Sequence, residues 1–163
     1  MASTTDVIEK KILLRASRSR VYRALSDSRE FGAWFGMRLL GPFVAGQAVR
    51  GTITPTTADP EVARLQKPFE GLPIELEVVG LEPERLFSFH WHPHAVERDK
   101  DYSEEPSTLV AFEIEEAAGG VLLTVRESGF DRIPLARRAK AFTANDEGWG
   151  IVVKLIERHL AAS

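Results

Sequence analysis

One glutamate stands at the end of a strand-like segment, where its carboxylate could do chemistry. Val121, Leu123 and Val125 alternate with other residues ahead of Glu127, and strand residues two apart point to the same face. If that face lines the interior, Glu127 lies in apolar surroundings, where it could bind a cation or act as an acid or base. The alternative is a position at the rim of the sheet, solvated or paired with an arginine.

A second polar pair lies near the C-terminus. Asn145 and Asp146 are three or four residues from both Phe142 and Trp149, so on a helix at least one of them borders the aromatic side. That residue could present a hydrogen-bonding group to a ligand. It could equally bond to a strand end or to loop backbone, because buried polar groups need a partner with or without a ligand.

Three histidines raise the question of a metal site. His90, His92 and His94 alternate along the chain, and alternate strand residues share a face from which imidazoles can bind zinc. However, Pro93 interrupts the strand before His94, and the neighbouring aromatic residues are better candidates for the inward face. No nearby carboxylate completes the set, so we predict no metal site.

The sequence is rich in large aromatic residues that could line or fill an interior space. Individually each suits a packed core, but together they could leave room for a molecule. With Glu127 and Asn145 they form the predicted ligand-binding set. The aromatic members are Trp34, Phe35, Phe89, Trp91, Phe112, Phe142 and Trp149.

Arg132, Arg137, Arg138 and Lys140 form a basic cluster where the last helix is expected to begin. A helix N-terminus already favours anions, so an anionic ligand or partner could dock there. Solvated surface is the simpler interpretation.

The elements that must position these residues follow from hydropathy patterns. Ser17 can cap a first helix that ends near Asp27, and a second helix over 28–35 ends at Gly36. Asp59 and Pro60 can start a further short helix. Alternating apolar residues predict strands, and Gly119-Gly120 a tight hairpin. The predicted strands are 7–15, 37–40, 46–55, 72–81, 87–92, 108–115 and 121–127.

The last 30 residues change to a helical pattern. Leu135, Phe142, Trp149 and Ile156 are seven apart, with Ala139, Val153 and Leu160 on the same stripe. This predicts one long amphipathic helix over 134–162. Gly148 and Gly150 are unfavourable inside it, which indicates a bend or the close approach of another backbone.

Composition excludes several classes of function. The chain has 163 residues, typical of one domain, and a net charge of −3, and its pI near 5.8 argues against a nucleic-acid partner. Its apolar runs are far too short for a membrane span, and the start lacks a signal-peptide pattern, so we expect a cytoplasmic protein. Zero cysteine excludes disulfides, thiolate catalysis and iron–sulfur centres. Compact phosphate-binding, dinucleotide and nucleophile-elbow motifs are absent as well.

The order of elements and four local motifs resemble the START-like helix-grip superfamily, also called SRPBCC. Within it the sequence is similar to the AHSA-like branch, the homologues of the activator of the heat-shock-protein-ninety ATPase. The resemblance implies an α+β fold in which a curved antiparallel sheet wraps around one long C-terminal helix, with two short helices after the first strand. The motifs are FSFHWHP at 87–93, DYS at 101–103, ESGFD at 127–131 and NDEGW at 145–149.

The resemblance also implies a cavity between sheet and helix that takes an apolar or amphipathic small molecule, with no cofactor. The oxygenase label of some relatives conflicts with the absence of cysteine, because a Rieske cluster needs two. We therefore expect a small-molecule-binding protein. Two alternatives are a chaperone-activator-like interaction module and a cyclase or hydrolase-type enzyme that uses Glu127.

Overall fold

The computed structural model describes residues 7–93 and 104–162. Seven antiparallel strands form one sheet in the order β1-β7-β6-β5-β4-β3-β2. The strands are β1 (Val7–Leu14), β2 (Met37–Leu39), β3 (Ala48–Ile53), β4 (Pro73–Glu82), β5 (Leu86–Trp91), β6 (Thr108–Ala117) and β7 (Gly120–Ser128). The helices are α1 (Arg18–Ser26), α2 (Ser28–Phe35), α3 (Pro60–Gln66) and α4 (Leu135–Ala162), with 3-10 turns η1 (Lys67–Phe69) and η2 (Phe130–Arg132).

The two short helices after β1 begin and end where their capping residues predict. The Ser17 hydroxyl accepts from the backbone N–H of Arg20 at 3.2 Å, and the Asp27 carboxylate accepts from Arg29 and Glu30 at 3.0 and 3.1 Å. These bonds satisfy N–H groups that a helix start leaves unpaired. Gly36 ends α2 with φ 108°, a left-handed conformation that favours glycine.

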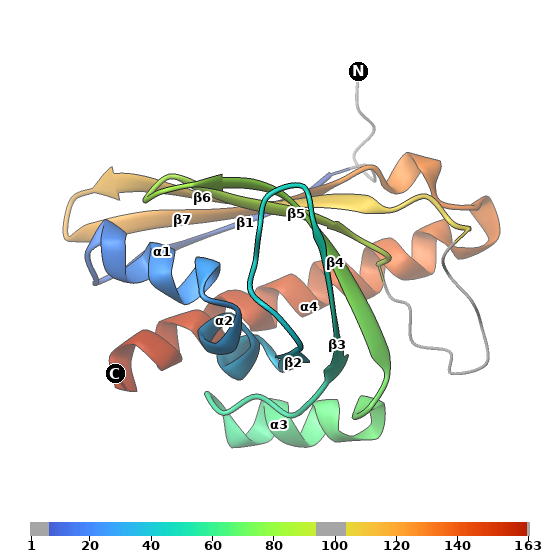
Figure 1. Ribbon diagram of the computed structural model, residues 1–163, viewed down its shortest axis with the longest axis horizontal. Helices are drawn as coiled ribbons and strands as arrows, with labels where there is room; N and C mark the ends of the chain where they lie inside the picture. Colours follow the sequence, from blue (N-terminus) through green and yellow to red (C-terminus); the bar gives the residue numbers. More distant parts are fainter. Residues whose placement is uncertain (1–6, 94–103, 163) are drawn as a thin grey trace.

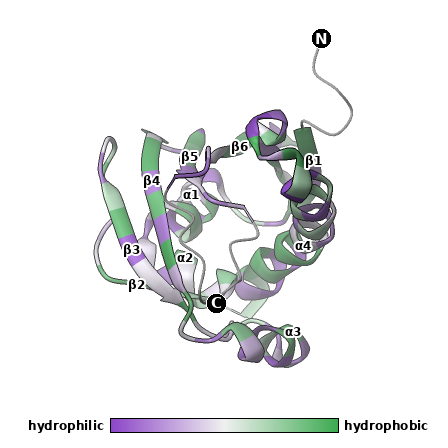
Figure 2. Cartoon of the chain, turned by 90° about the vertical axis from the view of Figure 1, so that its right-hand side faces the viewer, coloured by the Kyte–Doolittle hydropathy of each residue, from purple (hydrophilic) through white to green (hydrophobic). Residues whose placement is uncertain are grey.

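The sheet bends around α4. Figure 1 shows the strands crossing one side of the molecule and α4 running beneath them. In the end-on view of Figure 2 the sheet forms an arc from β1, beside α4, through β6, β5 and β4 to β3, with α1 and α2 inside the arc. An irregular register between Val78 and Gly80 interrupts the pairing of β4 with β5, and such bulges increase bending. The predicted helix-grip arrangement is therefore confirmed.

The inward face of the sheet is apolar and the outward face is charged, as alternation predicts. Val110, Phe112 and Ile114 of β6 are buried. On the outer face Arg126 of β7 bridges Glu9 of β1 and Glu113 of β6 at 2.6 and 3.2 Å. Burying one face against helices therefore fixes the register of these strands.

The long helix departs from its predicted stripe at the N-terminal end. Trp149, Val153 and Ile156 are buried as expected, but Leu135 is 78% exposed and Ala139 is exposed as well. Figure 1 shows the first turns of α4 projecting past the ends of β1 and β7, so neither strand covers an apolar side chain there. Within the described ranges, no helix combines the length and apolarity that a bilayer crossing requires.

Candidate functional site

The Glu127 side chain is completely buried and is the centre of a four-donor hydrogen-bond network. Its Oε1 accepts from the Trp149 indole at 2.7 Å and from the Asn145 amide at 2.9 Å. Its Oε2 accepts from the Trp91 indole at 2.7 Å and from the Thr108 hydroxyl at 2.5 Å. The alternative position at a solvated rim is therefore wrong.

The network joins four elements through one carboxylate. Trp91 lies on β5, Thr108 on β6, Glu127 on β7, and both Asn145 and Trp149 on α4. Indole and amide N–H groups can only donate, so each of these would lose its partner if the carboxylate were removed. Buried unpaired donors are costly, which makes Glu127 a structural link between sheet and helix as well as the polar centre of the site.

Two carboxylate oxygens offer about four acceptor positions, and protein donors occupy four of them. A substrate could reach the carboxylate only by displacing one of these donors. Among the described residues, no lysine or arginine pairs with Glu127, so neutral donors surround it. This arrangement suits positioning better than proton transfer.

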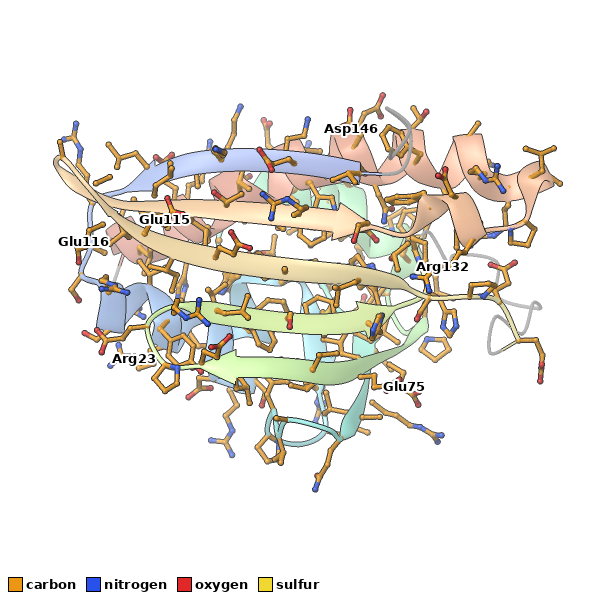
Figure 3. All side chains as sticks on the ribbon, turned by 90° about the horizontal axis from the view of Figure 1, so that it is seen from above. Arg23, Glu75, Glu115, Glu116, Arg132 and Asp146 are labelled. Carbon is orange, nitrogen blue, oxygen red and sulfur yellow. The ribbon has the colours of Figure 1, made fainter. Side chains whose placement is uncertain are left out.

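Thr108 is the member of the network that the sequence analysis missed. It is the inward-facing residue at the start of β6, two before Val110, and it pairs across strands with Trp91. The same alternation that placed Val110 and Phe112 inward could have indicated it. Asp146, by contrast, turns away from the network toward β1 (Figure 3), where it pairs with Lys10 at 3.0 Å.

The aromatic rings beside the network touch one another. The Trp91 ring centroid is 5.7 Å from that of Trp149, and Phe35 lies 6.0 and 5.8 Å from the two indoles. Phe112 is 5.8 Å from Trp149, and Phe89 is 5.5 Å from Trp91. These five predicted site residues therefore form one wall between sheet and helix, with separations typical of direct ring contact.

Of the two remaining aromatic candidates, Trp34 contacts the wall through Phe35, with ring centroids 5.7 Å apart, whereas Phe142 lies elsewhere. Trp34 is buried at the base of α2, where its indole donates to the Ala24 carbonyl at 2.8 Å. Phe142, which is half-buried, packs against Phe130 of η2 with ring centroids 5.2 Å apart. Both have local structural partners.

Gly148 of α4 has no close neighbour from residues 7–93 and 104–162 on the side where a side chain would stand. Gly148 is seven residues from Ala141 and seven from Leu155, both of which are buried, so it lies on their side of the helix. A Cβ added at Gly148 would meet no atom of the described residues within 4 Å, and the same holds for Gly150. The expected close approach of another backbone at these glycines is therefore not seen in the described part of the chain.

Two residues of the basic cluster at the start of α4, Arg137 and Arg138, have internal partners. Arg137 donates to both oxygens of Glu105 at 2.8–3.2 Å and to the Pro93 carbonyl at 2.9 Å. Arg138 donates to the carbonyls of Asp131 and Ile133. Arg137 thus holds the end of β5 and the chain leading into β6 against α4, whereas Arg132 and Lys140 are exposed.

The histidines face a shallow groove on the outer side of the sheet. His90 and His92 lie near Glu75 and Glu77 of β4 in a depression of about 470 Å³. The His90 Nδ1 and His92 Nε2 atoms are 3.2 and 3.0 Å from the carbonyls of Thr108 and Glu105. Over residues 7–93 and 104–162, no three metal-binding side chains converge, and His94 lies outside these residues.

The fold and the site together define a helix-grip protein with a polar centre between sheet and helix. The family model described as "Activator of Hsp90 ATPase homolog 1-like protein" matches residues 15–161. The chain therefore belongs to this family. Comparison with functionally curated proteins gives no match.

Solved structures share the fold at low sequence identity. DynU16, described as a putative protein in the dynemicin biosynthetic locus, has 22% identity and a TM-score of 0.66. The match covers 96% of this chain and 47% of DynU16, so this chain spans about half the length of DynU16. MLL2253 from Mesorhizobium loti has 16% identity and a TM-score of 0.70, with 96% and 98% of the two chains covered. The Aha1 dimer from Colwellia psychrerythraea has 13% identity and a TM-score of 0.63, with 93% and 92% covered.

Proposed function

We propose that this protein binds a small apolar or amphipathic molecule between the curved sheet and α4, in the cytoplasm and without a cofactor. The observation that carries the proposal is the open space at Gly148. Its helical neighbours on the same side, Ala141 and Leu155, are buried, yet a Cβ added at Gly148 would meet no described atom within 4 Å.

The surroundings of this space suit an amphipathic ligand. Trp149 follows Gly148 directly, and its ring continues into the wall formed with Trp91 and Phe35. Asn145, three residues before Gly148, is half-buried and directs its amide N–H to Glu127, which leaves its carbonyl oxygen facing away as an acceptor. Binding sites are commonly apolar with a few fixed polar groups of this kind.

Filling the space tests the proposal. We would titrate the wild type with the neutral fluorescent probe N-phenyl-1-naphthylamine and compare Gly148→Leu with Gly150→Leu, which adds the same side chain on another side of α4. The proposal predicts saturable binding to the wild type, binding about tenfold or more weaker for Gly148→Leu, corresponding to about 1.4 kcal/mol, and a near-normal affinity for Gly150→Leu. Equal affinities for all three proteins would contradict it.

The family description favours a second candidate, an interaction with a chaperone. Internal bonds of Arg137 and Arg138 leave less of the basic cluster for such a contact. A pull-down with purified Hsp90 at low salt separates the two functions, because an electrostatic contact is strongest there. Retention of Hsp90 that survives Gly148→Leu would favour the interaction module, whereas an empty pull-down with saturable probe binding would favour the ligand-binding protein.

A further inference from the structure

Helix α3 is attached at its two ends and contributes no fully buried side chain. Asp59, its N-cap, pairs through Oδ2 with Arg158 of α4 at 2.8 Å. At the other end the Gln66 side chain accepts from the Thr56 N–H at 2.8 Å and donates to the Phe35 carbonyl at 3.0 Å. Between these ends, Val62 is partly buried against the core and Leu65 is 64% exposed. Such an element has little burial to hold it closed and can open at low cost in free energy.

This helix lies where α2 meets α4, next to the aromatic wall. Gln66 is bonded to the backbone of Phe35, and the Phe35 ring contacts both Trp91 and Trp149. The segment leading into α3 is fixed to the same end of α2, because the Thr56 hydroxyl donates to the Trp34 carbonyl at 2.6 Å. Movement of α3 would therefore break the bond that joins it to the backbone of Phe35.

One side of α4 leads from the open space to the anchor of α3. Gly148, Ile151, Leu155 and Arg158 follow one another at spacings of three, four and three, which places them along one side of the helix. Ile151 is 40% exposed although Leu155 is buried. This side of α4 therefore runs from Gly148, at the proposed binding space, past the partly exposed Ile151 to Arg158, which forms the ion pair with Asp59.

We propose that α3 is a hinged cover over the ligand entrance between α2 and α4, and that the Asp59–Arg158 ion pair is its latch. This inference rests on the proposed ligand-binding function. A latch controls how fast a ligand enters and leaves and has little effect on the affinity itself, since it changes the barrier and not the contacts in the bound state.

The test removes the latch and leaves the cap intact. In Arg158→Ala, Asp59 keeps its Oδ1 bonds to the N–H groups of Glu61 and Val62. Lys154→Ala, an exposed position on α4, removes the same charge as a control, and Arg158→Lys restores it. We would measure amide hydrogen exchange of residues 60–69, and N-phenyl-1-naphthylamine association and dissociation by stopped flow.

The proposal predicts that Arg158→Ala accelerates exchange in residues 60–69 by about two- to fivefold, as expected for an exposed ion pair, with no change in β6 or β7. Both probe rates should rise together while the dissociation constant stays within about twofold. Lys154→Ala and Arg158→Lys should resemble the wild type. Faster amide hydrogen exchange in residues 60–69 with unchanged probe rates would contradict the proposal that α3 covers the entrance, but it would not contradict ligand binding. No probe binding to the wild type would overturn both.

Discussion

Trp91 and Trp149 donate their indole N–H groups to opposite oxygens of the same buried carboxylate. Their rings are 5.7 Å apart, and the two bonds to Glu127 are both 2.7 Å long. One residue comes from the sheet and the other from α4, so the shared acceptor fixes the position of the helix relative to β5. The network therefore sets the shape of the interior on which ligand binding depends.

Replacing Glu127 should destabilise the protein strongly. In Glu127→Gln an amide N–H₂ group replaces one carboxylate oxygen, which in the wild type accepts from two donors. Because an N–H₂ group cannot accept, at least one N–H of Trp91, Trp149 or Asn145 is left unpaired. We expect a loss of about 2–4 kcal/mol in the free energy of unfolding, measured by urea denaturation with tryptophan fluorescence. Glu115→Gln, at an exposed position of β6, should stay within about 0.5 kcal/mol of the wild type. A similar small loss for Glu127→Gln would contradict the importance of the network.

The two glycines of α4 should be replaceable by alanine with a gain in stability. Neither added Cβ meets a described atom within 4 Å, and alanine is favoured over glycine inside a helix by about 1 kcal/mol. Gly148→Ala and Gly150→Ala should each raise the free energy of unfolding by about 0.5–1 kcal/mol. A loss of stability in Gly148→Ala alone would mean that the space beside it is filled, which would remove the basis for the binding site.

The ion pair between Arg137 and Glu105 should contribute more than a surface pair. The two side chains are only 14% and 12% exposed, and Arg137 also holds the Pro93 carbonyl. Arg137→Ala should cost about 1–3 kcal/mol, less than the loss of one partner from a fully buried pair. Lys140→Ala, at an exposed position of the same helix, provides the control and should be nearly neutral. Equal effects of the two substitutions on the melting temperature would show that the contacts of Arg137 with Glu105 and Pro93 do not stabilise the fold.

Stability should depend on pH through Glu30. Burial alone would raise the pKa of this carboxyl, but hydrogen bonds from His159 and Arg20 and the charge of Arg20 outweigh it, so the pKa lies below its ordinary value. A lowered folded-state pKa stabilises the protein above the unfolded-state pKa, about 4.3, and this contribution disappears as the pH falls through the folded-state value.

Glu30→Gln tests this dependence. At pH 7 it should lower the free energy of unfolding by about 1–3 kcal/mol, and the difference from the wild type should shrink as the pH falls below about 4. Glu147→Gln, at an exposed position, should show no such pH dependence. A difference between wild type and Glu30→Gln that stays constant from pH 7 to pH 3 in urea titrations would contradict the assigned pKa direction.

The elements of this fold are predictable because local rules agree with tertiary packing. Ser17, Asp27 and Gly36 mark the boundaries of α1 and α2 by capping chemistry alone. Alternation of apolar and polar residues places one face of β4 and β6 inward. Leu135 and Ala139 are exceptions, because the predicted apolar stripe continues past the point where the sheet stops covering the helix. The sequence does not encode where that point lies.

The site was only partly predictable. Glu127, Asn145, Trp91 and Trp149 could each be identified as candidates by periodicity, but their shared bonds depend on how four elements meet in space. Thr108 shares the alternation of Val110 and Phe112, but a threonine at a strand start does not by itself indicate a bond to a carboxylate. The occupation of Arg137 by Glu105 and Pro93 was also not foreseeable, because these contacts span more than 30 residues of sequence.

The most direct test of the account is native mass spectrometry of the protein purified under mild conditions, compared with its denatured mass. The account predicts an additional small-molecule mass that disappears on denaturation, is lost or strongly reduced in Gly148→Leu and is retained in Gly150→Leu. If the wild type carries only the mass of its own chain, and no apolar or amphipathic compound in a thermal-shift screen raises its melting temperature as mass action requires, the ligand-binding function is contradicted.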